Sequence, residues 1–202
     1  MEKPYKTIKE PAEDEFVEKK SRFIAYTSPV HTVEEANAFI AGIRQRHWDA
    51  THNVPAFVLR SGVQRSSDDG EPGGTAGMPV LDVLLKSGVQ DVCVVVTRYF
   101  GGILLGAGGL VRAYSHACSL ALEAAGVVTM APCAAMELTV DYSYYERVNN
   151  LLADHGARVQ NADFGAAVTL AYTMEETRLP AFAAALTCLL YTSPSPRDAH
   201  ES

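Results

Sequence analysis

The sequence lacks the features that mark membrane-spanning, secreted and zinc-binding proteins. It has no run of eighteen apolar residues, which excludes a transmembrane helix, and its opening, MEKPYKTIKEPAEDEF, has no apolar centre of a secretory signal. The four cysteines stand far apart, with no CxxC pair and no histidine at metal-ligand spacing. We therefore expect a cytoplasmic protein without membrane association or a structural metal, in which the cysteines are buried free thiols.

Positive charge is scarce as well. Seventeen lysines and arginines stand against 24 acidic residues, which gives a net charge of −7 and an isoelectric point near 5.3. This balance excludes a protein that coats nucleic acid through bulk charge, so any such contact must be a local patch. Residues 132–202 carry −5 of the net charge and residues 1–131 carry −2. Because Pro132 stands at this change, we place a domain boundary there.

The first part of the chain alternates strand and helix patterns. Residues 1–15 are charged and contain two prolines, which predicts a loose lead-in. Apolar periodicity then predicts a strand at 16–27, a helix at 33–43, a strand at 53–60, a surface loop at 66–79, a helix at 80–87, a strand at 91–99 and a helix at 108–125. The unbroken apolar centre of the strand at 91–99 indicates burial on both faces.

The second part has the pattern β-α-β-β-α, which is a split βαβ unit without its last strand. The elements are expected at 134–141, 144–155, 157–164, 166–173 and 175–186. Where the last strand belongs, the chain reads CLLYTSPSPRD, whose proline tract breaks secondary structure. This string resembles a translated transposase sequencing adapter, so we interpret residues 188–202 as an artefactual tail; the alternative is a natural proline-rich tail.

A glycine-rich stretch, FGGILLGAGGL, lies between the buried strand and the following helix, where free N–H groups and the helix dipole suit an anion. It is neither a Walker A loop, which needs GKS or GKT, nor a dinucleotide fingerprint, because Val111 stands at the third glycine position. Arg98, Tyr99 and Arg112 flank the stretch and suit phosphate contact and base stacking. The alternatives are glycines that serve tight turns and an Arg98 paired with Asp91 or Asp69.

A second motif places three carboxylates, Asp68, Asp69 and Glu71, within four residues of a loop. Such a group is able to hold Mg²⁺ as part of a larger site. The alternative is a solvated turn, because Asp-Asp-Gly-Glu-Pro is also a typical turn sequence.

The strings KKSRFIA, SDDGEPGGTAGMPVL and VVVTRYFGGILLGAGGLVRAY resemble the IMPACT family, in its bacterial two-domain form. The resemblance implies an α+β fold: a two-layer N-terminal domain of the ribosomal-protein and GHMP-kinase type at 16–131, then a truncated ferredoxin-like domain at 132–187. Eukaryotic members regulate translation through an activator of an initiation-factor kinase, using an extra domain, so we do not carry that partner over. The surface of bacterial members suggests polynucleotide or ribosome contact.

The leading hypothesis is a cytoplasmic RNA- or ribosome-associated regulator of translation. Its nucleic-acid or anion site is assigned to Lys20, Arg22, Arg98, Tyr99, Gly101, Gly102, Gly106, Gly108, Gly109 and Arg112. The motif loop comprises Asp68, Asp69, Gly70, Glu71, Gly74, Thr75 and Gly77. No catalytic residue, metal ligand or cofactor is assigned, and no protein partner. The alternative is a Mg²⁺-dependent enzyme that binds a nucleotide or phosphate with the same loop and the carboxylates at 68–71; the missing P-loop lysine counts against it.

Overall fold

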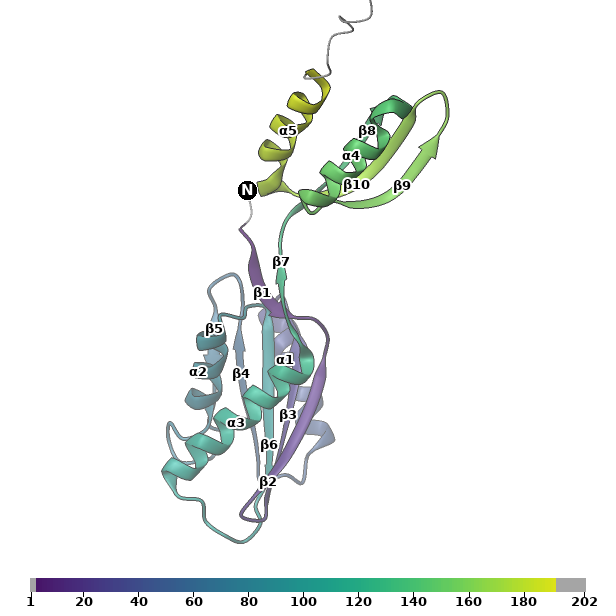
Figure 1. The fold of residues 1–202 in the computed structure, drawn as a ribbon. Coiled ribbons are helices and arrows are strands. Elements are labelled where there is room, and N and C mark those ends of the chain that lie inside the picture. Colours follow the sequence, from purple (N-terminus) through teal and green to yellow (C-terminus); the bar gives the residue numbers. More distant parts are fainter. Residues whose placement is uncertain (1–2, 192–202) are drawn as a thin grey trace, which may run out of the picture. The chain divides into compact units, whose positions relative to one another are not determined.

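The computed structural model describes residues 3–191, which form two compact units, one from Pro4 to Met130 and one beginning at Ala131 (Figure 1). Both units combine helices with antiparallel strands, so the α+β class is confirmed. Within this described range, no helix has the length and apolar character needed to cross a membrane.

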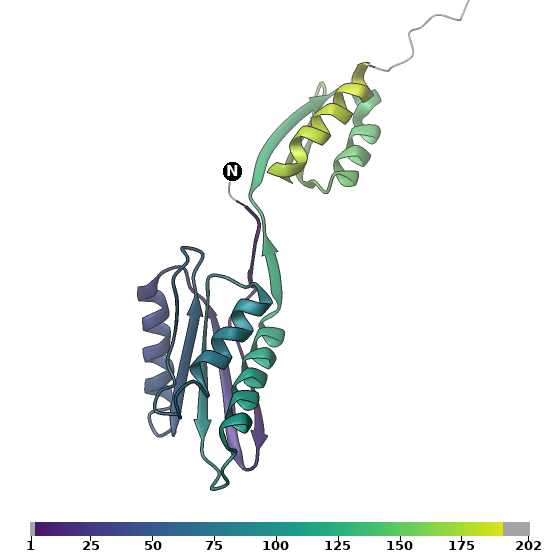
Figure 2. The same ribbon diagram turned by 90° about the vertical axis from the view of Figure 1, so that its left-hand side faces the viewer.

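The N-terminal unit is built on a five-stranded antiparallel sheet. Its strands, in spatial order, are β2 (Ala12–Glu18), β3 (Ser21–Pro29), β6 (Val92–Tyr99), β4 (His52–Val58) and β5 (Gln64–Ser66). Helices α2 (Gly77–Ser87) and α3 (Ala107–Ala125) cover one face, and α1 (Val33–Arg46) covers the other (Figure 2). Strand β6 lies in the middle of the sheet and is buried except at Tyr99.

Two separate apolar cores lie on the two faces of this sheet. Val94 and Val96 of β6 join the core under α2 and α3, whereas Cys93 and Val95 join the core under α1. The unit therefore has three layers, and the expected two-layer arrangement is wrong. The apolar run of β6 explains the difference, because a strand that is apolar on both faces requires cover on both.

The expected loose lead-in at 1–15 is wrong for residues 5–8 and 12–15. These residues form β1 (Tyr5–Ile8), which pairs with β7 (Val127–Met130), and most of the edge strand β2. The charged alternation of β2 conceals a strand in which two side chains, Ala12 and Phe16, pack against the core. The expected strand at 16–27 is a hairpin, because Lys19 and Lys20 turn the chain with positive φ angles of 47° and 64°.

The second unit has a three-stranded sheet in the order β8 (Cys133–Val140), β10 (Val168–Glu175), β9 (Arg158–Phe164), packed against α4 (Tyr142–Asp154) and α5 (Leu179–Tyr191). A single 3-10 turn, η1 (Glu176–Arg178), precedes α5. This is the strand order of a split βαβ unit. Among residues 3–191, the outer edge of β8 has no strand partner.

Helix α5 continues through Cys188 to Tyr191, five residues past the end expected at residue 186. The remainder of the proposed artefactual tail, 192–202, lies outside the described residues.

The expectation of four buried thiols is half wrong. Cys93 and Cys118 are buried, whereas Cys133 and Cys188 are exposed. Burial raises the pKa of each buried thiol to about 12. Because the thiolate is the reactive form, these two side chains are protected both by burial and by protonation.

We expect a thiol reagent at about pH 8 to modify Cys133 in the folded protein and to leave Cys93 and Cys118 unmodified until urea unfolds the chain. Peptide mass mapping before and after unfolding identifies the labelled residues. Modification of Cys93 in the native protein at the rate of Cys133 contradicts the burial described here.

Candidate nucleic-acid interface

The β2–β3 turn and the β6–α3 loop meet at one end of the N-terminal sheet (Figure 1). Gly101, in the loop, lies so close to Lys20 that a Cβ at this position would overlap the Lys20 backbone. The hydroxyl of Ser21 accepts a hydrogen bond from the Gly101 N–H at 3.2 Å. Gly101 is therefore needed for close approach, as the alternative interpretation of the glycines proposed.

The motif loop begins with an internal cap. The carboxylate of Asp68 accepts hydrogen bonds from the backbone N–H groups of Gly74, Ala76 and Gly77 at 2.8, 3.1 and 2.8 Å. Burial raises the pKa of Asp68, but the three hydrogen bonds together outweigh it and hold the pKa below its ordinary value. This cap fixes the start of α2 at Gly77, three residues before the predicted start.

Glu71 lies at the centre of a buried polar cluster. Its Oε1 accepts from Arg98 Nη1 at 2.6 Å and from the Tyr114 hydroxyl at 2.7 Å, and its Oε2 lies 3.7 Å from His52 Nε2. The Glu71 and Arg98 side chains are only 3% and 6% exposed. Burial, followed by the hydrogen bond to Glu71, raises the pKa of Tyr114, so this hydroxyl stays protonated and donates.

The third carboxylate, Asp69, has separate partners. It accepts from the Asn53 N–H at 2.7 Å and from Arg44 Nη2 at 2.6 Å. The three carboxylates of the loop are thus engaged individually, and over residues 3–191 no group of three His, Cys, Asp or Glu side chains is arranged to hold a metal ion. The geometry therefore offers no support to the Mg²⁺-dependent alternative.

Arg98 and Tyr99 do not share one groove, because successive residues of a strand point to opposite faces of the sheet. Arg98 points to the α3 side and pairs with Glu71, rather than with Asp91 or Asp69 as the alternative proposed. Tyr99 points to the α1 side, where its hydroxyl contacts His47 Nδ1 at 2.9 Å and donates to Asp49 at 3.1 Å. The expected pairing of an exposed phosphate ligand with a stacking ring is wrong for these two residues.

Arg22 is likewise outside the groove. It lies opposite Tyr99 in the β3–β6 register, on the α1 side, and forms an ion pair with Glu15. Arg44 and Arg46 are paired with Asp69 and Glu13 in the same way.

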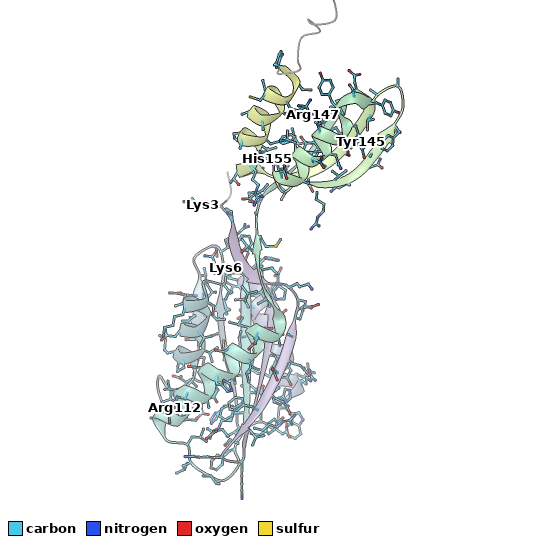
Figure 3. The ribbon with its side chains drawn as sticks, in the orientation of Figure 1. Lys3, Lys6, Arg112, Tyr145, Arg147 and His155 are labelled. Atoms are coloured by element: carbon cyan, nitrogen blue, oxygen red, sulfur yellow. The ribbon has the colours of Figure 1, made fainter. Side chains whose placement is uncertain are left out.

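Two adjoining cavities surround the N-terminus of α3 and share Leu105 in their walls. We name them together the groove. The cationic cavity, of about 260 Å³, is lined by Glu18, Lys19, Arg112 and His116 among others. The apolar cavity, of about 380 Å³, is lined by Thr51, His52, Phe100, Leu104 and Leu110 among others. Figure 3 shows Arg112 on the first turns of α3.

The exposed cations of the groove have no acidic partner. The side chains of Lys19, Lys20 and Arg112 form no ion pair or hydrogen bond with any residue that the structure describes. Glu18 is the single acid in the wall of the cationic cavity. Lys20 follows Lys19 in the β2–β3 turn, where its backbone lies against Gly101, but it lines neither cavity. The cationic cavity therefore has a local excess of positive charge in a chain that is acidic as a whole.

The remaining glycines shape the N-terminus of α3. Gly102 and Gly106 have positive φ angles of 83° and 75°, so they turn the β6–α3 loop. Gly109 packs against Leu105, where a Cβ would come within 2.9 Å of the leucine Cβ. The N–H groups of the first helical turn have no partner within the helix and open on the groove, since Gly106 lines the apolar cavity and Gly109 the cationic one.

Comparison with known proteins agrees with this architecture. The Impact N-terminal domain family matches residues 19–122, and the domain of unknown function DUF1949 matches residues 138–190. IMPACT family member YvyE of Bacillus subtilis (strain 168) is 43% identical over 180 residues, which are 88% of this chain and 83% of YvyE. The chain belongs to the IMPACT family. Member YigZ of Escherichia coli (strain K12) is 38% identical over 172 residues, 83% of this chain and 84% of YigZ.

A solved structure and a eukaryotic relative extend the comparison. A crystal structure described as that of a hypothetical protein covers 96% of this chain and 96% of its own length, with 34% identity and a TM-score of 0.62. Protein IMPACT of Rattus norvegicus is 33% identical over 96 residues, 44% of this chain and 30% of that protein.

The strings that resemble the IMPACT family build the groove and its buried support. KKSRFIA supplies the β2–β3 turn, SDDGEPGG supplies Asp68 and Glu71, and the glycine-rich string supplies Arg98 and the N-terminus of α3. Sequence reasoning missed Thr51 and Leu105 as groove residues, because only the tertiary fold brings their segments together. Lys19 could have been assigned from its place beside Lys20.

Removal of the Glu71 carboxylate should be far more costly than removal of an exposed one. Glu71→Ala leaves the Arg98 charge buried without its partner, so we expect a loss of about 3–5 kcal/mol in the free energy of unfolding. Urea denaturation measures the loss. The matched control is Glu15→Ala, which breaks a half-exposed Glu–Arg pair and should cost about 0–1 kcal/mol. Equal losses in the two variants contradict the buried role of Glu71.

The Asp68 cap predicts an acid-dependent stability. Because its folded pKa is lowered, the contribution of Asp68 is fully present above the ordinary Asp pKa of about 3.8 and is lost as pH falls through the folded pKa. The stability difference between wild type and Asp68→Asn should therefore be largest near neutral pH and shrink below about pH 4. Urea midpoints across this range test it, with Asp82→Asn, at an exposed position of α2, as the control. A difference that is independent of pH contradicts the prediction.

Proposed function

We propose that this member of the IMPACT family is a cytoplasmic regulator of translation that associates with RNA or the ribosome through the groove. The observation that carries the proposal is that two cations without an acidic partner, Lys19 and Arg112, line one cavity at the N-terminus of α3, with Lys20 next to Lys19 in the β2–β3 turn. Membership of the IMPACT family supports the link to translation. The resemblance described above implies that eukaryotic members of this family regulate translation.

Phosphate is the chemistry that fits the cationic cavity. Lysine and arginine side chains that are already paired with carboxylates lose much of their attraction for an anion, whereas unpaired ones gain binding energy by releasing counterions from a polyanion. A helix N-terminus adds N–H donors with a favourable dipole. A net charge of −7 confines this attraction to the groove and favours contact with a few phosphates rather than many.

The proposal revises the assignment of residues. Arg22 and Arg98 are engaged by Glu15 and Glu71, and Tyr99 lies on the other face of the sheet. Lys19 joins Lys20 and Arg112 as a phosphate ligand in their place.

The test is binding to bulk RNA and co-sedimentation with ribosomes at about 50 and 200 mM salt. The double variant Lys19→Ala/Arg112→Ala should bind RNA several-fold more weakly. It should also reduce the salt slope by about 1.4, since each phosphate contact to a single strand contributes about 0.7.

The matched control removes one arginine and one lysine outside the groove, Arg46→Ala/Lys86→Ala, which changes the net charge equally. It should retain both the affinity and the slope. Equal losses of affinity in the two double variants would show that net charge, and not the groove, determines RNA binding, and this contradicts the proposal. Absence of salt-sensitive RNA binding by the wild type also overturns it.

A further inference from the structure

The apolar cavity has side chains that the binding of phosphate leaves without a role. Phe100 is 46% exposed and Leu104 is 82% exposed, both on the β6–α3 loop. Exposed apolar side chains grouped at a concave surface mark an interaction site rather than random surface. Leu105 lies in the walls of both cavities, so this cavity adjoins the cationic one.

Polar groups in the same wall remain able to bind a ligand. Thr51 Oγ1 accepts from the Phe100 N–H at 3.0 Å, which leaves its own O–H to donate elsewhere. Arg98 lines the cavity, and its buried Nε has no hydrogen-bond partner among residues 3–191. A buried N–H without a partner is costly, so an acceptor brought by a ligand is favoured there.

We propose that the apolar cavity receives an unpaired nucleobase of the RNA whose phosphates lie in the cationic cavity. The Phe100 ring stacks on the base, Leu104 covers its edge, and Thr51 and Arg98 offer donors to its carbonyl or ring-nitrogen acceptors. The protein therefore selects single-stranded RNA, because bases within a duplex are stacked and paired and are not available to the cavity. This inference rests on the proposed function and specifies its ligand.

The adjoining cations decide between a nucleobase and other apolar occupants. An apolar peptide or acyl chain would fill the cavity as well, but neither brings the negative charges that the adjoining cations, Lys19 and Arg112, attract. A nucleotide strand carries both groups on one chain, with bases projecting from the phosphates. Stacking on an aromatic ring is tolerant of base identity, so the cavity needs no sequence-specific hydrogen bonds.

The experiment compares three RNA ligands of about ten nucleotides, within the usual site sizes for single strands. They are an unstructured strand, an abasic ribose-phosphate strand of the same charge, and a blunt duplex. The wild type should bind the unstructured strand at least roughly fivefold more tightly than the abasic strand and the duplex. Phe100→Ala should lose about fivefold to hundredfold in affinity for the unstructured strand, with no change for the abasic strand and no change in salt slope.

The matched control is Phe164→Ala, which removes an aromatic ring of similar exposure (56%) from the second unit and should change nothing. Leu104→Ala, at an exposed loop position, tests the same cavity if Phe100→Ala has a lowered urea midpoint. Equal binding of base-containing and abasic strands by the wild type overturns the base pocket while leaving the phosphate site intact. Failure to bind either strand overturns both proposals.

Discussion

The groove depends on the buried ion pair between Glu71 and Arg98. Arg98 belongs to β6, Glu71 to the loop before α2, and Tyr114, which donates to the same carboxylate, to α3. Arg98 Nη2 also reaches the Ser21 hydroxyl at the start of β3, at 3.4 Å. One pair of charges thus joins four segments that are distant in the sequence. Because both charges are buried, any movement that separates them leaves a charge in the interior without its partner, which is costly. The ion pair therefore holds the walls of the groove in place.

The carboxylates of the motif loop are bound by partners within the protein, which explains how a chain of net negative charge has a cationic cavity. Asp68, Asp69 and Glu71 lie within four residues of one another, yet each carboxylate is bound to backbone N–H groups or to a particular arginine. Hydrogen bonds and ion pairs within the protein therefore offset the negative charge of the three carboxylates. Lys19 and Arg112, in contrast, lie in its wall without acidic partners among the described residues. The local field is set by which charges remain unpaired rather than by their total number.

Elements with strong local periodicity could be predicted from the sequence, and the site could be predicted only in part. The apolar run of β6 and the helix after the glycine-rich stretch lie where they were expected. The roles of Arg98 and Tyr99 were not predictable, because they depend on which face of a buried strand each residue occupies and on a carboxylate 27 positions away in the sequence. β1 was missed for a related reason: its partner β7 is more than a hundred residues distant, so no local pattern reports the pairing.

The uneven distribution of charge also bears on the proposed binding of RNA. Residues 132–202 carry −5 of the net charge, so the second unit repels a polyanion and adds little to its attraction. Phosphate contacts alone, few in number and screened within about 8–10 Å at cellular salt, give weak and indiscriminate binding. An apolar cavity beside them changes this, because stacking is not screened by salt and acts only on an unpaired base. In the proposed complex, discrimination between single and paired strands therefore comes from the uncharged, exposed side chains of the cavity wall, Phe100 and Leu104.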